Sequence, residues 1–112
     1  MATGISPACE ISVTGPIDDT LERIARELVE ARLIACANIA DAPVKSIYRW
    51  RGAVEVEQER RMHLHTRLAL VERVVALITE RHPYEVPNVT AVPLLAGNEE
   101  YLDWIASETV EP

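Results

Sequence analysis

The segment from Pro43 to Thr66 reads PVKSIYRWRGAVEVEQERRMHLHT. It predicts two long strands that turn over between Trp50 and Ala53. Successive residues of a strand point to opposite faces, so the second strand has two different sides. One side carries Val54, Val56, Gln58, Arg60, Met62 and Leu64, and the other carries Glu55, Glu57, Glu59, Arg61, His63 and His65. We expect a partly apolar face and a charged face.

The predicted hairpin is too long for a compact chain of this size. An arm of about a dozen residues spans roughly 40 Å at about 3.3 Å per residue. A compact chain of this length has a diameter of roughly 34 Å. The hairpin should therefore project from the domain, and a projecting strand edge with apolar side chains favours pairing with another copy of the chain.

Length and composition limit the class of protein. A chain of 112 residues forms one domain, here taken as residues 1–112. Its net charge of -7 argues against nucleic acid or an anionic membrane as a partner, because both attract basic surfaces. The first residues lack the basic and apolar segments of a targeting signal, and two cysteines do not make a disulfide framework. We expect a cytoplasmic protein.

The remaining segments alternate between strand and helix patterns. Before the hairpin they predict a strand at 8–14, a helix at 21–29 with an Asp19–Glu22 capping box, and a buried strand at 33–39. After the hairpin they predict a helix with apolar residues at 70–78 that ends at His82, a strand at 88–95 and a short last helix after Asn98. This order predicts an α+β fold, a ferredoxin-like βαββαβ sandwich with a protruding hairpin and a C-terminal helix. Both main helices would cover one face of the sheet, which leaves the other face for a partner subunit.

Two groups of residues are candidates for metal binding. His63 and His65 share a strand face with Glu59, a spacing that can chelate zinc or copper, although the same pattern is typical of a hydrated polar face. Cys36 lies in the apolar run LIACANI, which favours a small buried side chain over a metal ligand. Both alternatives stay open for each group.

The segment His82–Pro87, HPYEVP, is a candidate binding loop. In one interpretation its two prolines stiffen a loop that holds the polar side chains of His82, Tyr84 and Glu85 close together. In the other, the prolines only end a helix and Tyr84 packs in the core. Tyr48 and Trp50 share a face of the first hairpin strand, where they either line a cleft or pack on a neighbouring subunit. Familiar catalytic signatures are absent from the sequence, so we do not expect an enzyme, although Tyr84, Glu59 and His82 have acid–base side chains.

Four motifs together resemble one known family. ARELVEARLIACANI at 25–39, SIYRWRG at 46–52, HPYEVP at 82–87 and YLDWI at 101–105 occur in the order and spacing of the CutA family of divalent-cation tolerance proteins. The resemblance covers about residues 11–109. It implies a ferredoxin-like homotrimer, in which the hairpins of three subunits extend one another's sheets, and a relationship to PII-type signalling trimers.

The resemblance also implies where a ligand would bind. The family is linked to copper and other divalent ions, with no established reaction, and its clefts lie between subunits. Carried over by position, the cleft candidates are Tyr48, Trp50, Glu59, Tyr84 and Tyr101, and the metal candidates are His82 and the nearby Cys36. His63 and His65 are further metal candidates by their spacing on the strand alone. A copper or zinc ion is therefore one expected ligand. The alternative is a signalling or scaffold trimer that binds a small molecule in the cleft.

The chain departs from the family at several positions. Copper-binding members can carry a cysteine late in the first strand and two histidines before Pro-Tyr, whereas this chain has Val13 and Arg81-His82. His65 replaces a usual lysine and His63 a usual aliphatic residue. A copper site of the family's kind is thus incomplete here, while His63 and His65 could supply a different one.

Overall fold

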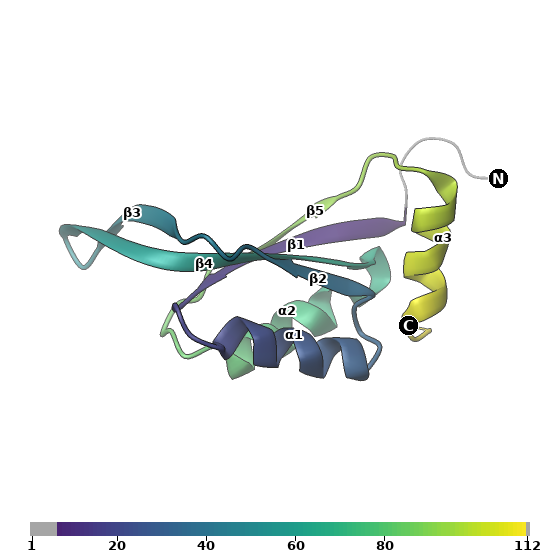
Figure 1. The fold of residues 1–112 in the computed structure, drawn as a ribbon, viewed down its shortest axis with the longest axis horizontal. Coiled ribbons are helices and arrows are strands. Elements are labelled where there is room, and N and C mark those ends of the chain that lie inside the picture. The colour runs from purple at the N-terminus through teal and green to yellow at the C-terminus, as the bar shows by residue number, and fades with distance from the viewer. Residues whose placement is uncertain (1–6, 112) are drawn as a thin grey trace.

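The computed structural model describes residues 7–111, in which five strands form one antiparallel sheet (Figure 1). The elements are β1 (Ala8–Gly15), α1 (Thr20–Glu30), β2 (Cys36–Ile39), β3 (Val44–Trp50), β4 (Ala53–Arg67), a 3-10 turn (Leu68–Leu70), α2 (Val71–Arg81), β5 (Val89–Pro93) and α3 (Glu99–Glu108). Helices α1 and α2 lie on one face of the sheet, and α3 lies across its end away from the hairpin (Figure 1). The expected α+β class is confirmed.

Strand β4 organises the sheet. The strand order is β2-β4-β1-β5, and β3 pairs with the outer half of β4. The 15-residue β4 therefore faces two shorter strands in succession, β2 near the core and β3 beyond it. Together β2 and β3 take the place of one strand in the ferredoxin-like order.

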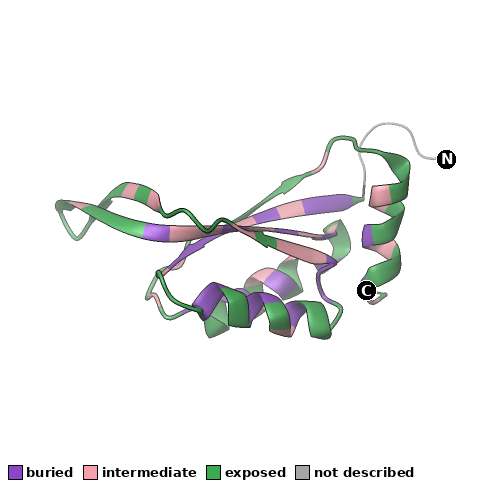
Figure 2. Cartoon of the chain, viewed as in Figure 1, coloured by how far each residue is buried: buried purple, intermediate pink, exposed green. Residues whose placement is uncertain are grey.

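The core lies between the sheet and the two helices. Ile11 pairs with Leu64 and Val13 with Met62 across β1 and β4, and all four are fully buried. They pack on buried side chains of the two helices, among them Leu21, Ile24, Leu28, Val74 and Ile78. Figure 2 shows burial concentrated in the sheet centre and the inner helix faces, while most of the hairpin is exposed.

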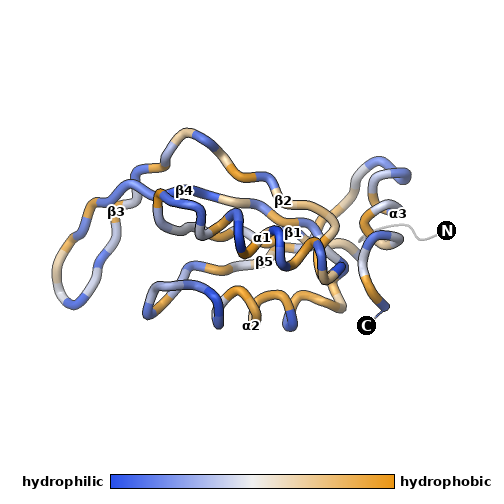
Figure 3. The backbone as a smooth tube through the Cα atoms, turned by 60° about the horizontal axis from the view of Figure 1, so that its bottom comes forward, coloured by the Kyte–Doolittle hydropathy of each residue, from blue (hydrophilic) through white to orange (hydrophobic). Residues whose placement is uncertain are grey.

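The hairpin projects as expected, and the described chain measures 50 × 28 × 24 Å. Its turn is formed by Arg51 and Gly52, which have φ angles of 50° and 82°. Two successive positive φ angles are typical of a type I′ turn, whose twist matches that of the strands. Apolar side chains of the hairpin are open to solvent, with Ile47, Val54 and Val56 exposed by 66%, 63% and 59%. Figure 3 shows these hydrophobic stretches in the projecting part.

Two local predictions need correction. The expected strand at 33–39 begins at Cys36, and Leu33, Ile34 and Ala35 are the buried residues before it. The residues of β2 itself are half-buried or exposed, because β2 is an edge strand. Helix α1 starts after Asp19, but the side chain that accepts a backbone hydrogen bond is Asp18, from the Thr20 N–H at 2.8 Å.

Within residues 7–111 the helices cannot traverse a lipid bilayer. The longest of them have 11 residues, whereas a transmembrane helix needs about 20 apolar residues.

Candidate functional site

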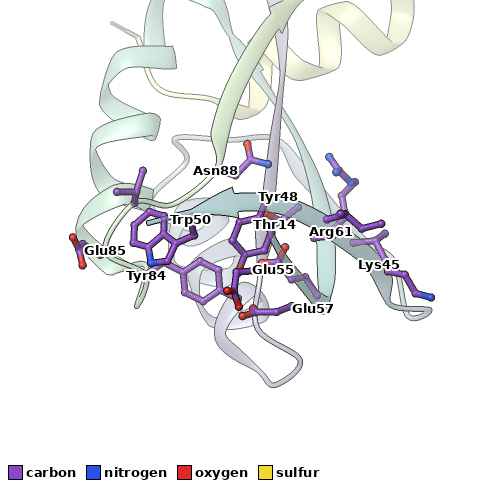
Figure 4. Close-up of a pocket in the computed structure, with 15 residues that line it drawn as sticks. Thr14, Lys45, Tyr48, Trp50, Glu55, Glu57, Arg61, Tyr84, Glu85 and Asn88 are labelled. Atoms are coloured by element: carbon purple, nitrogen blue, oxygen red, sulfur yellow. The ribbon is translucent and has the colours of Figure 1, made fainter. Parts of the chain in front are cut away.

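A groove lies between the hairpin and the loop that joins α2 to β5 (Figure 4). Its volume is about 660 Å³. Three aromatic residues line it, Tyr48, Trp50 and Tyr84. The charged residues of its wall are four glutamates, Glu55, Glu57, Glu59 and Glu85, together with Lys45 and Arg61. The groove is therefore aromatic and predominantly acidic.

Strand pairing positions the acidic wall. In the β3–β4 ladder, Tyr48 lies opposite Glu55, Ser46 opposite Glu57 and Val44 opposite Glu59. Residues directly opposite each other on antiparallel strands share a face. The alternation predicted for β4 thus places its three glutamates and Tyr48 on the groove side.

His82 fixes the other wall of the groove. Its Nε2 donates a hydrogen bond to the Thr14 carbonyl at 2.8 Å, and its Nδ1 accepts one from the Tyr84 N–H at 3.2 Å. The imidazole is 6% exposed and its ring lies edge-on to that of Tyr84, with centroids 4.6 Å apart. His82 therefore ties the loop after α2 to β1 and orients Tyr84, and neither ring nitrogen is available for a metal ion.

Both groove tyrosines stay protonated at neutral pH. Burial raises the pKa of Tyr84 well above its ordinary value, and hydrogen bonding to Glu59 and the charges of Glu59 and Glu57 raise it further. The pKa of Tyr48 is also raised, by desolvation and by its interaction with Glu57. The phenols are consequently hydrogen-bond donors beside carboxylates, and Glu59 is 7% exposed.

A second cluster of reactive side chains forms at the opposite end of the sheet. Tyr101 of α3 has its hydroxyl 2.6 Å from His65 Nδ1 and 3.2 Å from Cys36 Sγ. The Nε2 atom of His65 lies 2.9 Å from Glu10 Oε1. Burial raises the pKa of Tyr101 above its ordinary value, and hydrogen bonding to Cys36 adds to the increase. The carboxylate, imidazole, phenol and thiol thus form one hydrogen-bonded network.

The structure divides the sequence candidates between these two places. Tyr48, Trp50, Glu59 and Tyr84 line the groove. Tyr101, Cys36 and His65 form the second cluster, and His63 lies half-buried on the same sheet face, opposite Ser12 and Asn38. Cys36 is half-buried with polar neighbours, so it is not the buried side chain that its apolar run indicated.

Sequence reasoning missed Glu10, Glu55 and Glu57 as members of these sites. Glu55 and Glu57 could have been found, because the alternation of β4 already placed them on the face of Glu59. Glu10 faces His65 only through the register of β1 with β4. A long-range register of this kind is not visible in a strand pattern.

Comparison with known proteins decides the family. The family described as "CutA1 divalent ion tolerance protein" matches residues 9–108. The chain belongs to the CutA family.

Two of its CutA relatives match this chain over most of their own length. The divalent-cation tolerance protein CutA of Archaeoglobus fulgidus is 40% identical over 101 residues, which cover 90% of this chain and 96% of that protein. The corresponding protein of Thermus thermophilus is 38% identical over 99 residues, which cover 88% of this chain and 95% of that protein. The chloroplastic CutA of Arabidopsis thaliana is longer, and the match covers 56% of it.

Solved CutA structures share the fold. The crystal structure of CutA1 from Shewanella sp. SIB1 superposes with a TM-score of 0.90 at 34% identity, covering 96% of this chain and 99% of that one. The A. fulgidus structure, described as a periplasmic divalent cation tolerance protein, gives a TM-score of 0.85 at 36% identity over 90% and 97% of the chains.

The copper ligands that the resemblance to CutA implied do not fit this chain. Val13 is fully buried in the core, and Arg81 donates to both carboxylate oxygens of Glu27, at 3.1 and 3.0 Å. His82, the remaining member, uses both ring nitrogens for backbone groups. Within residues 7–111, moreover, groups of three or more His, Cys, Asp or Glu residues that could hold a metal ion are absent. One chain alone therefore offers no complete site of the family's kind.

Proposed function

We propose that this CutA chain is a divalent-cation tolerance protein without catalytic activity, which acts as a homotrimer and binds cations in the groove beside its hairpin. The observation that carries the proposal is the acidic wall of Glu55, Glu57 and Glu59, together with the relatives named for divalent-cation tolerance. Carboxylate and phenol oxygens are ligands that hard divalent ions accept.

The exposed hairpin supports the trimer. Ile47 and Val56 lie opposite each other and are 66% and 59% exposed, far from the core. Exposed apolar side chains on a long projecting strand pair are typical of a surface that is buried by association. The groove is lined by the same two strands, so a second subunit on the hairpin would supply the ligands that one chain lacks.

Titration with Mn(II), followed by water-proton relaxation, tests the cation site. We expect saturable binding by the native assembly and weakening by about 10-fold or more in a Glu55→Gln/Glu57→Gln variant, which removes two carboxylates. Glu30→Gln is the matched control, because Glu30 is exposed at the end of α1 and outside the groove. Equal binding by the two variants would refute the groove as the site.

A small organic ligand in the same groove is a second candidate. The volume of about 660 Å³ and the three aromatic side chains are typical of ligand sites. The four glutamates favour a cationic or neutral molecule over an anion. Thermal-shift measurements on metal-free protein with nucleotides, amines and sugars distinguish the two: a shift without added metal supports this second function.

The proposal places the protein in the cytoplasm. Both Cys9 and Cys36 are free thiols, as expected in a reducing compartment. The A. fulgidus structure is described as that of a periplasmic protein, so fractionation of cells that naturally express this protein is the decisive measurement. Recovery with periplasmic markers would contradict this part of the proposal.

A further inference from the structure

We propose that Cys36 and His65 form a second cation site, chemically distinct from the groove, for a soft thiophilic ion such as Cu(I) or Ag(I). The two residues lie at the end of the sheet where β2, β4 and β1 meet α3, away from the hairpin (Figure 1). The groove offers oxygen ligands, whereas this cluster offers sulfur and nitrogen.

The sheet register brings the donor atoms together. Cys36 of β2 pairs with His65 of β4, and Glu10 of β1 pairs with the same His65 from the other side. Paired residues share a face, so the three side chains stand in a row across the sheet. The Cys36 Sγ and His65 Nδ1 atoms are 4.0 Å apart.

Glu10 sets the tautomer of His65. A carboxylate accepts hydrogen bonds, so His65 Nε2 donates its proton to Glu10 Oε1 at 2.9 Å. The lone pair of Nδ1 then points toward the thiol and the Tyr101 hydroxyl. Metal-binding histidines commonly donate their second ring N–H to a carboxylate in this way, which orients the ring and makes it a stronger ligand.

The spacing suits one bridging ion. Typical metal–sulfur and metal–nitrogen bonds of about 2.3 and 2.1 Å allow donor atoms up to about 4.4 Å apart to share an ion. The observed 4.0 Å lies inside that limit and requires a wide angle at the metal. Two ligands, one of them a thiolate, select soft ions that accept low coordination numbers over oxygen-seeking divalent ions.

Without a metal ion, the Tyr101 hydroxyl contacts both proposed ligand atoms. The hydroxyl donates to Nδ1 at 2.6 Å and its oxygen accepts from the Cys36 S–H at 3.2 Å, so the phenol bridges the two ligand atoms. An incoming ion replaces that bridge: the Cys36 S–H bond breaks, a metal–sulfur bond forms and the thiol proton leaves to solvent. The phenol stays neutral and turns its O–H away from Nδ1.

Ag(I) is the probe that tests this site. The native assembly is titrated in chloride-free buffer, followed by calorimetry and by the ultraviolet absorption of the silver–thiolate bond. We expect one Ag(I) per chain with release of a proton. Binding is lost in Cys36→Ser and weakened about 10- to 100-fold in Glu10→Gln, which only orients the imidazole. His65→Gln, which keeps the thiol, should weaken binding at least as much.

The chain supplies its own controls. Cys9 is 1% exposed and contacts the Val92 carbonyl at 2.9 Å, and His63 lies two residues from His65 on the same face. Cys9→Ala and His63→Gln should bind Ag(I) as the wild type does, and circular dichroism verifies that each variant is folded. Unchanged binding in Cys36→Ser or in His65→Gln would overturn the proposal.

This inference builds on the proposed function, because both assign cation binding to the chain, and the two can fail separately. Glu55→Gln/Glu57→Gln leaves the thiol intact and should bind Ag(I) normally. Cys36→Ser leaves the groove intact and should bind Mn(II) normally. Wild-type protein that binds Ag(I) but not Mn(II) would therefore refute the groove alone, and wild-type protein that binds Mn(II) but not Ag(I) would refute the cluster alone.

Discussion

His82 connects three parts of the molecule through one buried imidazole. It links the end of α2 to the Thr14 carbonyl of β1 and to the backbone of Tyr84. Replacing His82 with Ala removes a buried partner from the Thr14 carbonyl and a part-buried partner from the Tyr84 N–H. We therefore expect a loss of about 2–3 kcal/mol in the free energy of unfolding. Urea unfolding at a fixed chain concentration measures it.

His63→Ala is the matched control for this prediction. His63 is half-buried and lies on the polar sheet face, so we expect its loss to change the free energy of unfolding by less than about 0.5 kcal/mol. Equal destabilisation by the two substitutions would contradict the structural role assigned to His82.

The three tyrosines predict a pH dependence. The pKa of Tyr48, Tyr84 and Tyr101 is raised in the folded state, most of all by desolvation. At pH values below the pKa of tyrosine in the unfolded chain, about 10, the phenols are protonated in both the folded and the unfolded state. Their contribution to the free energy of unfolding is then fully present. As the pH rises above about 10, the unfolded chain ionises first and stability is lost. Ultraviolet titration should show phenolate forming at higher pH in native than in urea-unfolded protein; coincident curves would contradict it.

Single residues were the hardest part to predict from sequence. Cys36 lies in an apolar run that predicted burial, yet it is half-buried because it belongs to an edge strand only partly covered by α3. His82 was considered as a member of a binding loop or as part of a helix end, and it is buried at the end of α2 against β1. In both cases the environment comes from an element distant in sequence, which local patterns do not encode.

At the scale of elements, the hairpin turn depends on Gly52. Its φ of 82° is disfavoured for side chains with a Cβ, and a Cβ added there would meet nothing within 4 Å. The cost of Gly52→Ala is therefore one of backbone conformation, and we expect a loss of about 1–2 kcal/mol in thermal or urea unfolding. At Gly97, where the backbone requires no positive φ, Ala should change stability by less than about 0.5 kcal/mol. A smaller effect at Gly52 than at Gly97 would refute the turn assignment.

Elements with strong periodicity were predictable. The alternation of β4 and the apolar spacing of α1 and α2 correspond to the buried residues Met62, Leu64, Leu28 and Ile78. The division of the second strand into β2 and β3 was less evident, since residues 40–43 interrupt the pairing while β4 continues opposite them. Tyr48, Trp50, Glu59 and Tyr84, which the family resemblance implied for one cleft, all line the groove, whereas Tyr101 lies in a different cluster in the single chain.

At the scale of the whole molecule, the exposed side of the hairpin should hold the assembly together. Ile47→Glu/Val56→Lys places opposite charges on a cross-strand pair, so the hairpin itself remains paired while its apolar contact surface is lost. We expect this variant to sediment as single folded chains. Ile17→Glu, at a residue 55% exposed in the turn before α1, should leave the assembly unchanged. Retention of the full assembly by the double variant would exclude the hairpin as the contact.

Native mass spectrometry with and without Mn(II) reports the assembly and the bound cation in one measurement. We expect a mass of three 12.5 kDa chains with bound Mn(II), and we expect the Glu55→Gln/Glu57→Gln variant to lose the Mn(II) while it remains a trimer. A single-chain mass, or equal Mn(II) binding by the variant and the wild-type protein, would contradict this expectation.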